Sequence, residues 1–321
     1  MSIIKNNTSN LQALLNRLDS IPIKNEIENK IINKTLEEYS NNRIESIGLY
    51  AFYNCTSLTS VSFPVCINIG SYAFAFCSNL TNISFLSCIN IGNYAFWNCT
   101  SLTSVNFPAC TSIGNYAFYS CSNLTNISFP SCTSIGSCAF SSCTSLTSVD
   151  FPACTSIGAS AFQSCTSLTS IYFPVCTYIG SSAFQSCTSL SRVEIHAGTS
   201  IDSYAFNNCT GLTDIVFECT SIGSSAFKSC TSLSVAFIRG CSYICHDAFR
   251  NCSNLTGLYI NGSSVATLAN AQAFYNTPLY RSSYTGNYGS IYVDGSLLSL
   301  YKTATNWALY ASRITTDIGS N

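Results

Sequence analysis

Charged side chains are scarce in this chain of 321 residues, and their scarcity limits its possible partners. Asp, Glu, Lys and Arg make up 8% of the sequence, and the formal net charge is −1. None of them occurs between Ile47 and Val149, a run of 103 residues that also lacks His. Nucleic-acid binding requires a basic surface, and electrostatic attachment to a membrane requires a basic cluster. The sequence therefore predicts neither kind of partner.

Long apolar segments are missing too. No apolar stretch follows Met1 as a secretory signal peptide would require. No segment has the length and apolarity of a transmembrane helix. We therefore expect no membrane insertion, and the sequence leaves the localisation of the protein open.

Cysteine, in contrast, is abundant and evenly spaced. Of the 20 cysteines, 18 fall on an interval of about eleven residues that begins at Cys55 and skips Gly198. Self-similarity at a fixed period is typical of repeat proteins. Two intervals make a 22-residue unit with the pattern I-G-x-x-A-F-x-x-C-x-x-L-x-x-V/I-x-F-P-x-C-x-x, and ten units cover residues 47–264. The units begin at Ile47, Ile69, Ile91, Ile113, Ile135, Ile157, Ile179, Ile201, Ile222 and Ile244, and the eighth is one residue short.

Each unit predicts one strand and one tight return segment. Val61 and Phe63 alternate with serines, as in a strand with one buried face. The Ala-Phe pair, as in Ala73-Phe74, favours a short helical or 3₁₀ turn, and the glycine before it permits a bend in the backbone. One unit cannot bury its apolar face alone, so stacked units must cover one another. The sequence predicts an α/β solenoid of ten coils, with a parallel β-sheet on one face, helical or 3₁₀ turns on the other and columns of phenylalanine inside.

This repeat resembles the BspA-like leucine-rich repeat family, whose units carry I-G-x-x-A-F-x-x-C-x-x-L followed by an I-x-I-P strand. The resemblance covers residues 47–264. The chain departs from the pattern in having Phe where the family often has Ile, and Cys after most prolines. The resemblance implies the leucine-rich repeat fold and a role in adhesion to a cell surface, a host or matrix.

Residues 1–46 differ from the repeats. They hold 12 of the charged side chains, and Leu11, Leu14 and Leu18 share one helical face. We expect this segment to form either a helical cap on the first coil or a docking and oligomerisation element.

Residues 265–321 form the third predicted part of the chain. They retain part of one more coil at Ala273-Phe274, then continue into a strand at Ile291 and a helix over residues 297–313. This segment resembles C-terminal modules of BspA-like proteins from gut Firmicutes and their prophages, through I-Y-V followed by Y-K-T-A-T-N-W. We expect it to be a helical cap, because a terminal repeat must cover the exposed core.

The regular cysteines are expected to be buried free thiols. Cysteines of neighbouring coils would lie about 4.8 Å apart with parallel side chains, whereas a disulfide brings Cβ atoms to about 3.8 Å. A buried thiol can instead donate a weak hydrogen bond to a backbone carbonyl. Free thiols in this number indicate a reducing or anaerobic setting.

The sequence predicts no catalytic residue, no metal and no cofactor. The densest cluster of metal-ligating types is Cys241, Cys245, His246 and Cys252, which lacks the C-x₂-C spacing of structural zinc sites. Cys241 and Cys252 fall on the regular cysteine interval, so they are expected to be buried free thiols, and a metal site is the alternative. His196 follows Glu194 on one strand, but no activated serine or cysteine is implied beside them. The chain is therefore not expected to be an enzyme.

The outward strand positions change character along the repeat. Early units place Ser and Asn there, whereas later units place aromatic, apolar and charged residues. Solenoids bind partners through such continuous open faces, and exposed aromatic and arginine side chains are typical anchors. The alternative is drift in a decaying repeat, with the apolar members covered by the C-terminal cap. The candidate ligand-binding strip consists of Tyr172, Arg192, Glu194, Asp214, Val235, Phe237 and Tyr259.

Together these features favour a non-enzymatic binding protein that recognises a protein or glycan, for adhesion to a host or cell surface. The alternative is a structural or tail-associated, receptor-binding protein of a bacteriophage virion. In that case residues 1–46 would join a homo-oligomer or a virion partner.

Overall fold

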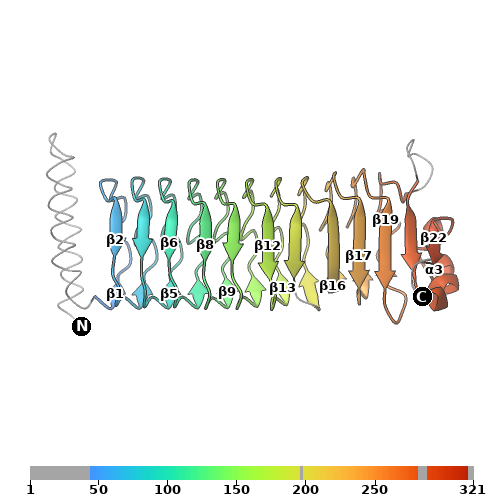
Figure 1. The fold of residues 1–321 in the computed structure, drawn as a ribbon, viewed down its shortest axis with the longest axis horizontal. Coiled ribbons are helices and arrows are strands. Elements are labelled where there is room, and N and C mark those ends of the chain that lie inside the picture. Colours follow the sequence, from blue (N-terminus) through green and yellow to red (C-terminus); the bar gives the residue numbers. More distant parts are fainter. Residues whose placement is uncertain (1–43, 196–197, 281–287, 317–321) are drawn as a thin grey trace. The chain divides into compact units, whose positions relative to one another are not determined.

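The computed structural model describes residues 44–195, 198–280 and 288–316. The chain divides into two compact units, with the boundary after Cys154. In each unit successive coils pair their strands in parallel, which makes each unit a parallel β-solenoid (Figure 1). The predicted solenoid is thereby confirmed. The helical cap or docking element was expected over residues 1–46, and residues 1–43 of it lie outside the described residues.

Every coil of the first unit contributes a two-residue strand and a three-residue strand. The short strands are β1 (Ser46–Ile47), β3 (Asn68–Ile69), β5 (Asn90–Ile91), β7 (Ser112–Ile113) and β9 (Ser134–Ile135). The longer strands form a five-stranded sheet and are β2 (Ser60–Ser62), β4 (Asn82–Ser84), β6 (Ser104–Asn106), β8 (Asn126–Ser128) and β10 (Ser148–Asp150). Equivalent residues pair across coils, as Val61 does with Ile83. The 22-residue period of the sequence is therefore the period of the backbone.

The second unit continues this plan with longer strands. The two- and three-residue strands are β11 (Ser156–Ile157), β13 (Tyr178–Ile179), β15 (Thr199–Ile201), β18 (Tyr243–Ile244) and β20 (Thr267–Leu268). The longer ones are β12 (Ser170–Phe173), β14 (Arg192–Ile195), β17 (Val235–Arg239), β19 (Gly257–Asn261) and β21 (Ser290–Val293), while β16 (Asp214–Ile222) runs through both positions of its coil. β20 and β21 make a coil beyond the ten predicted, and β22 (Ile314–Thr316) pairs with β21 after it. The prediction of ten coils is therefore too low, because the eleventh keeps its strands after losing most of the sequence pattern.

The return segment of each coil is not helical, contrary to the prediction. No α or 3₁₀ helix occurs in the described residues before Gly295. Instead, residues with a left-handed backbone conformation recur in the segment: Tyr50 and Asn54 have φ values of 56° and 57°. The Phe52 N–H consequently donates to Ala73 of the next coil at 2.7 Å, while the Ala51 N–H donates back to Gly48 at 3.4 Å. A helix would use all these N–H groups within its own segment, so the alternation is what joins the coils here.

The repeated glycine has a different role from the expected bend. Gly92 lies so close to the preceding coil that a Cβ would stand 2.7 Å from the Gly70 carbonyl carbon and 2.7 Å from the Ser71 nitrogen. Its own N–H donates to Ile69 of that coil at 2.8 Å. Gly114 is equally constrained, at 2.7 Å from the Asn93 nitrogen. Glycine is thus required because two backbones touch there.

Columns of aromatic rings fill the interior, as predicted. In the first unit Phe52 stacks on Phe74 with ring centroids 4.9 Å apart, and Phe74 stacks on Phe96 at 5.2 Å. A second column continues from Phe85 to Phe107 at 5.3 Å. Stacked or edge-on ring pairs contribute about 0.5–1.5 kcal/mol beyond the burial of their area. The core is therefore a one-dimensional series of nearly identical contacts.

The thiol columns lie inside this core and donate to backbone carbonyls, as predicted. Cys77 Sγ donates to the Phe52 oxygen at 3.0 Å, and Cys99 Sγ repeats this contact one coil later with Phe74 at 3.1 Å. The second column bonds within its own coil, as Cys88 Sγ does to the Asn90 oxygen at 3.3 Å. All 20 cysteines are thiols in the structure, and 18 of them are buried. The buried thiols of Cys77, Cys88 and Cys99 thus find acceptors in backbone carbonyls.

The C-terminal segment differs from the single helix predicted over residues 297–313. It contains η1 (Gly295–Leu297), α3 (Leu298–Thr303) and η2 (Ala308–Tyr310), because Ala304 is extended with ψ of 148° and ends α3. Trp307 nevertheless closes the last coil by donating from Nε1 to the Ala266 oxygen at 2.7 Å. No helix in the described ranges is long and apolar enough to cross a membrane.

Replacement of Gly92 by alanine is expected to lower the free energy of unfolding by about 1–3 kcal/mol. The added Cβ would overlap backbone atoms of the preceding coil at 2.7 Å. Gly48→Ala is the matched control at the same repeat position, because no atom lies within 4 Å of a Cβ there. Urea denaturation followed by circular dichroism measures both variants. Equal stability of the two would show that the coils separate there without cost.

The buried thiols are expected to resist modification in the native protein. Burial raises the pKa of Cys99 and of Cys143 to about 12, so both stay protonated and unreactive at pH 8. An aromatic disulfide reagent should modify only the half-buried Cys138 and Cys245 readily, and all 20 thiols after unfolding in guanidinium. Fast reaction of many more thiols in the folded protein would contradict the buried columns.

These raised pKa values also predict how stability depends on pH. Because the pKa of Cys99 is raised from 9.0 to about 12 in the folded protein, its contribution is complete below pH 9 and is lost as the pH rises toward 12. Denaturation midpoints should therefore fall across this alkaline range, and the fall should be smaller in Cys99→Ala. An identical pH dependence in the variant would count against this contribution.

Candidate binding surface

The seven residues of the predicted strip lie on one face of the second unit. Side chains two residues apart on a strand point to the same side, and the intervening Val193, Ile215 and Ala236 are buried. Strand register places Tyr172 beside Glu194 and Phe237 beside Tyr259. The remaining members are Arg192, Asp214 and Val235, of which Asp214 and Val235 are paired in register.

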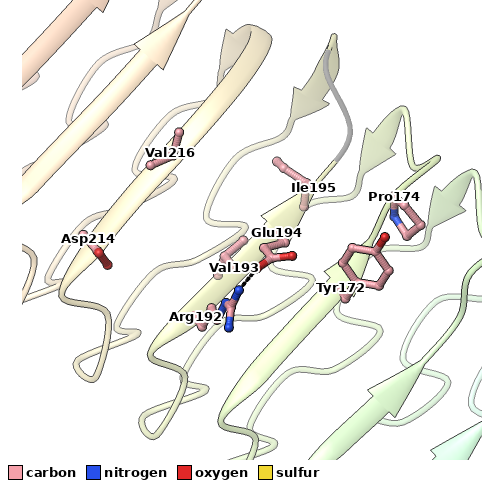
Figure 2. A pocket seen from close by; sticks show the side chains of 8 residues that line it. All are labelled: Tyr172, Pro174, Arg192, Val193, Glu194, Ile195, Asp214 and Val216. Carbon is pink, nitrogen blue, oxygen red and sulfur yellow. Dashed lines mark ion pairs between the residues drawn. The ribbon is translucent and has the colours of Figure 1, made fainter.

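A break in the sheet separates two parts of this strip. In the described part of the chain, β14 pairs with β12 alone, while β16 belongs to a different sheet with β17 and β19. Between β14 and β16 lies a groove of about 620 Å³ (Figure 2). Its lining residues are Tyr172, Pro174, Arg192, Val193, Glu194, Ile195, Asp214 and Val216. The strip is therefore a grooved surface and not a flat continuation of the regular face.

The sequence irregularities at this place explain the break. Gly198 occupies the position of a regular cysteine, with φ of 81°, and its N–H donates to the Glu218 oxygen at 2.7 Å. The pairing of β15 with β16 shifts register between Thr199 and Ser200. The eighth repeat is one residue short, and β16 runs through both strand positions of its coil as one nine-residue strand. His196 lies outside the described residues.

The groove carries a net charge of −1. Arg192 forms an ion pair with Glu194 on the same strand, and both side chains are largely exposed. Exposed ion pairs contribute about 0–1 kcal/mol, so this pair orients the two side chains more than it stabilises the fold. Asp214 supplies the second carboxylate and accepts a hydrogen bond from Thr213 Oγ1 at 3.4 Å. A ligand entering the groove would thus meet a carboxylate next to the exposed ring of Tyr172.

Beyond the groove the strip becomes an aromatic ladder. Phe237 stacks on Tyr259 with centroids 4.4 Å apart, and Tyr259 stacks on Tyr292 at 4.3 Å. Gly257 leaves room for the Tyr259 ring, because a Cβ added at position 257 would lie 3.3 Å from that ring. Val216 adjoins Phe237 in register and is 57% exposed. These four side chains form a row of apolar surface along the coils.

Val216 and Tyr292 belong to this surface but were not part of the predicted strip. Tyr292 follows an irregular segment, and only the pairing of β19 with β21 aligns it with Tyr259. The I-Y-V triplet was the available signal, because its tyrosine has the same place in its strand as Tyr259. The C-terminal cap leaves Val216 and Phe237 exposed, so the alternative that the cap covers the apolar members does not hold for these two.

The cysteine and histidine cluster is not assembled into one site. Cys241 Sγ donates to the Tyr243 oxygen, and Cys252 Sγ donates to the Phe227 oxygen of the preceding coil. His246 Nε2 is hydrogen-bonded to Ser224 Oγ at 3.0 Å. Within the described ranges, no group of three His, Cys, Asp or Glu side chains is placed to hold a metal ion.

Three solved structures are similar to this chain. A leucine rich cell surface protein from Faecalibacterium prausnitzii is 23% identical, covering 86% of this chain and 87% of that one, with a TM-score of 0.45. The pneumococcal vaccine antigen PcpA is 18% identical over 85% of this chain and 75% of that one, with a TM-score of 0.49. A leucine rich repeat protein of T. pallidum is 28% identical over 59% and 71%, with a TM-score of 0.38.

A search of curated proteins finds no match. The family model of the BspA type leucine rich repeat region, in contrast, matches six copies, over residues 25–131, 111–234 and 177–294. These matches span most of the chain and include the coils of both units. The chain therefore belongs to the BspA-type leucine-rich repeat family.

Proposed function

We propose that this protein is a non-enzymatic recognition protein that binds a protein or glycan on a host or cell surface, and so serves adhesion. The observation that carries the proposal is the groove between β14 and β16 beside an exposed aromatic row in an otherwise regular solenoid. Membership of a leucine-rich repeat family supports a binding role. The partner would cross the groove and extend over β17 and β19.

The chemistry of the strip suits binding better than catalysis. Tyr172 and Phe237 are exposed aromatic side chains, and such residues anchor many interfaces. Arg192 and Glu194 form an exposed ion pair with each other. This pair can be broken in favour of contacts with a partner at little cost to the stability of the fold. The groove is open to solvent, so its side chains are accessible to a macromolecular partner.

The combined substitution of Tyr172, Arg192 and Phe237 by alanine is expected to weaken binding at least a hundredfold, since each removes an anchor of about 1 kcal/mol or more. Surface plasmon resonance against a panel of immobilised matrix proteins and mucin glycans measures the affinity. The folding of the variant should be unchanged by circular dichroism, because all three side chains are exposed.

Tyr204→Ala is the matched control for this experiment, because Tyr204 is 43% exposed in the same unit but lies outside the strip. Binding should be retained in this variant. Unchanged affinity in the triple variant, for a partner that the native protein binds, would remove the strip as the binding site.

A further inference from the structure

The first unit carries an aromatic surface of its own, on the return segments and not on the outward strand positions. Four tyrosines occupy the same repeat position in successive coils and form a tyrosine column: Tyr50, Tyr72, Tyr94 and Tyr116. Their ring centroids are 4.9, 4.6 and 4.7 Å apart along the column. A second set lies alongside as an outer row: Tyr53, Phe76, Trp97 and Tyr119. We call the two sets together the aromatic edge.

The contact angles show how the outer row is oriented. The faces of Tyr72 and Tyr94 are occupied by stacking, with interplanar angles of 4° and 2° along the column. Trp97 meets these two rings at 65° and 61°, so it lies across their edges. Tyr53 crosses Tyr50 in the same way, at 79°. Rings placed across the column can offer a face to a ligand that follows the coils, while the column offers its hydroxyl-bearing edges.

The fold itself does not require aromatic residues at the column position. The same backbone position has φ of 55° in Cys138, 55° in Ser160 and 57° in Ser182, compared with 58° in Tyr94. Later coils therefore adopt this conformation with small side chains. Tyrosine is thus an addition to the repeat: it fills this position in four successive coils, from Tyr50 to Tyr116, and again singly at Tyr204.

The surroundings restrict the chemistry of a ligand. No charged residue or histidine occurs from Ile47 to Val149, so a charged ligand would lose hydration without gaining a counter-ion. The exposed polar groups are phenolic hydroxyls and amides, such as Asn54. Burial and the neighbouring tyrosines raise the pKa of Tyr72 above its ordinary value, so its hydroxyl remains a donor. The suitable ligand is uncharged, rich in hydroxyls and extended along the coils.

We propose that the aromatic edge is a binding site for a linear neutral polysaccharide, distinct from the open-face strip. Sugar rings present apolar C–H faces that pack on Tyr and Trp faces, and hydroxyls that bond to phenols and amides. A polymer of like sugars matches a surface that repeats once per coil. A protein partner would be expected to meet a polar rim with some charge, which this unit lacks between Ile47 and Val149.

Tryptophan fluorescence tests this site directly. The chain has two tryptophans, and Trp307 is fully buried, so a ligand-induced change in emission reports on Trp97. Titration of the full chain with a soluble neutral β-glucan or xylan should shift or quench this emission in a saturable way. The carboxymethyl derivative of the same polymer should bind at least tenfold more weakly.

The double variant Tyr72→Ser, Tyr94→Ser is expected to bind the neutral polymer at least tenfold more weakly and to remain folded, because serine occupies this position in Ser160 and Ser182. Tyr204→Ser is the matched control, since Tyr204 occupies the same position in the second unit with φ of 60°. The control should bind as the native protein does, and so should the triple variant of the open-face strip.

Three outcomes would overturn the proposal: no change in Trp97 emission with either the neutral β-glucan or the xylan, equal binding by the double variant, or tighter binding of the carboxymethyl polymer. A fourth outcome, dimerisation of the chain through the aromatic edge, is tested by sedimentation of the full chain. A dimer that disappears in Tyr72→Ser, Tyr94→Ser would assign the aromatic edge to a second copy of the chain and not to a glycan.

Discussion

The backbone contact between successive coils is the constraint on which the rest of the structure depends. Short strands, longer strands and return segments all use N–H groups to reach an adjacent coil, as Phe74 does toward Ala95 at 2.7 Å. The contact is so close at Gly92 and Gly114 that no side-chain carbon fits. Buried thiols such as Cys99 add donors to the same interface. Because each coil must satisfy its neighbour, the buried positions repeat while the outward positions are able to vary.

Both binding proposals concern positions that this constraint does not control. The groove lies where the eighth coil is a residue short, Gly198 replaces a cysteine and β14 loses its partner on one side. The tyrosine column of the aromatic edge uses a position that the backbone holds at a positive φ whatever the side chain. In one case the repeat is broken, and in the other an optional column is added to it. The two surfaces differ in chemistry, since Arg192, Glu194 and Asp214 line the first and the second is uncharged.

Much of this fold could be predicted because its period is visible in single residues. Spacing alone identified the Phe columns, the thiol columns and the strands around Val61 and its equivalents. The prediction of a helical return segment was wrong, because no local signal in the sequence reports the left-handed residue before each Ala-Phe pair. The strip was recognised from the outward residues Tyr172 to Tyr259, yet neither the groove nor the place of Tyr292 was. Both depend on which strands pair, and pairing is a relation between coils.

By itself the sequence determined the solenoid, its family and the identity of the buried columns, since a strict repeat of apolar residues can be buried only by stacking. The tertiary structure decided what the repeat could not express. It showed that glycine serves a close approach and not a bend, that β14 and β16 part to leave a groove, and that the surface rings of Tyr72 and Tyr94 stack on each other. The physical reason is the same in each case: these features arise between coils, where distance and orientation are set by packing and not by neighbours along the chain.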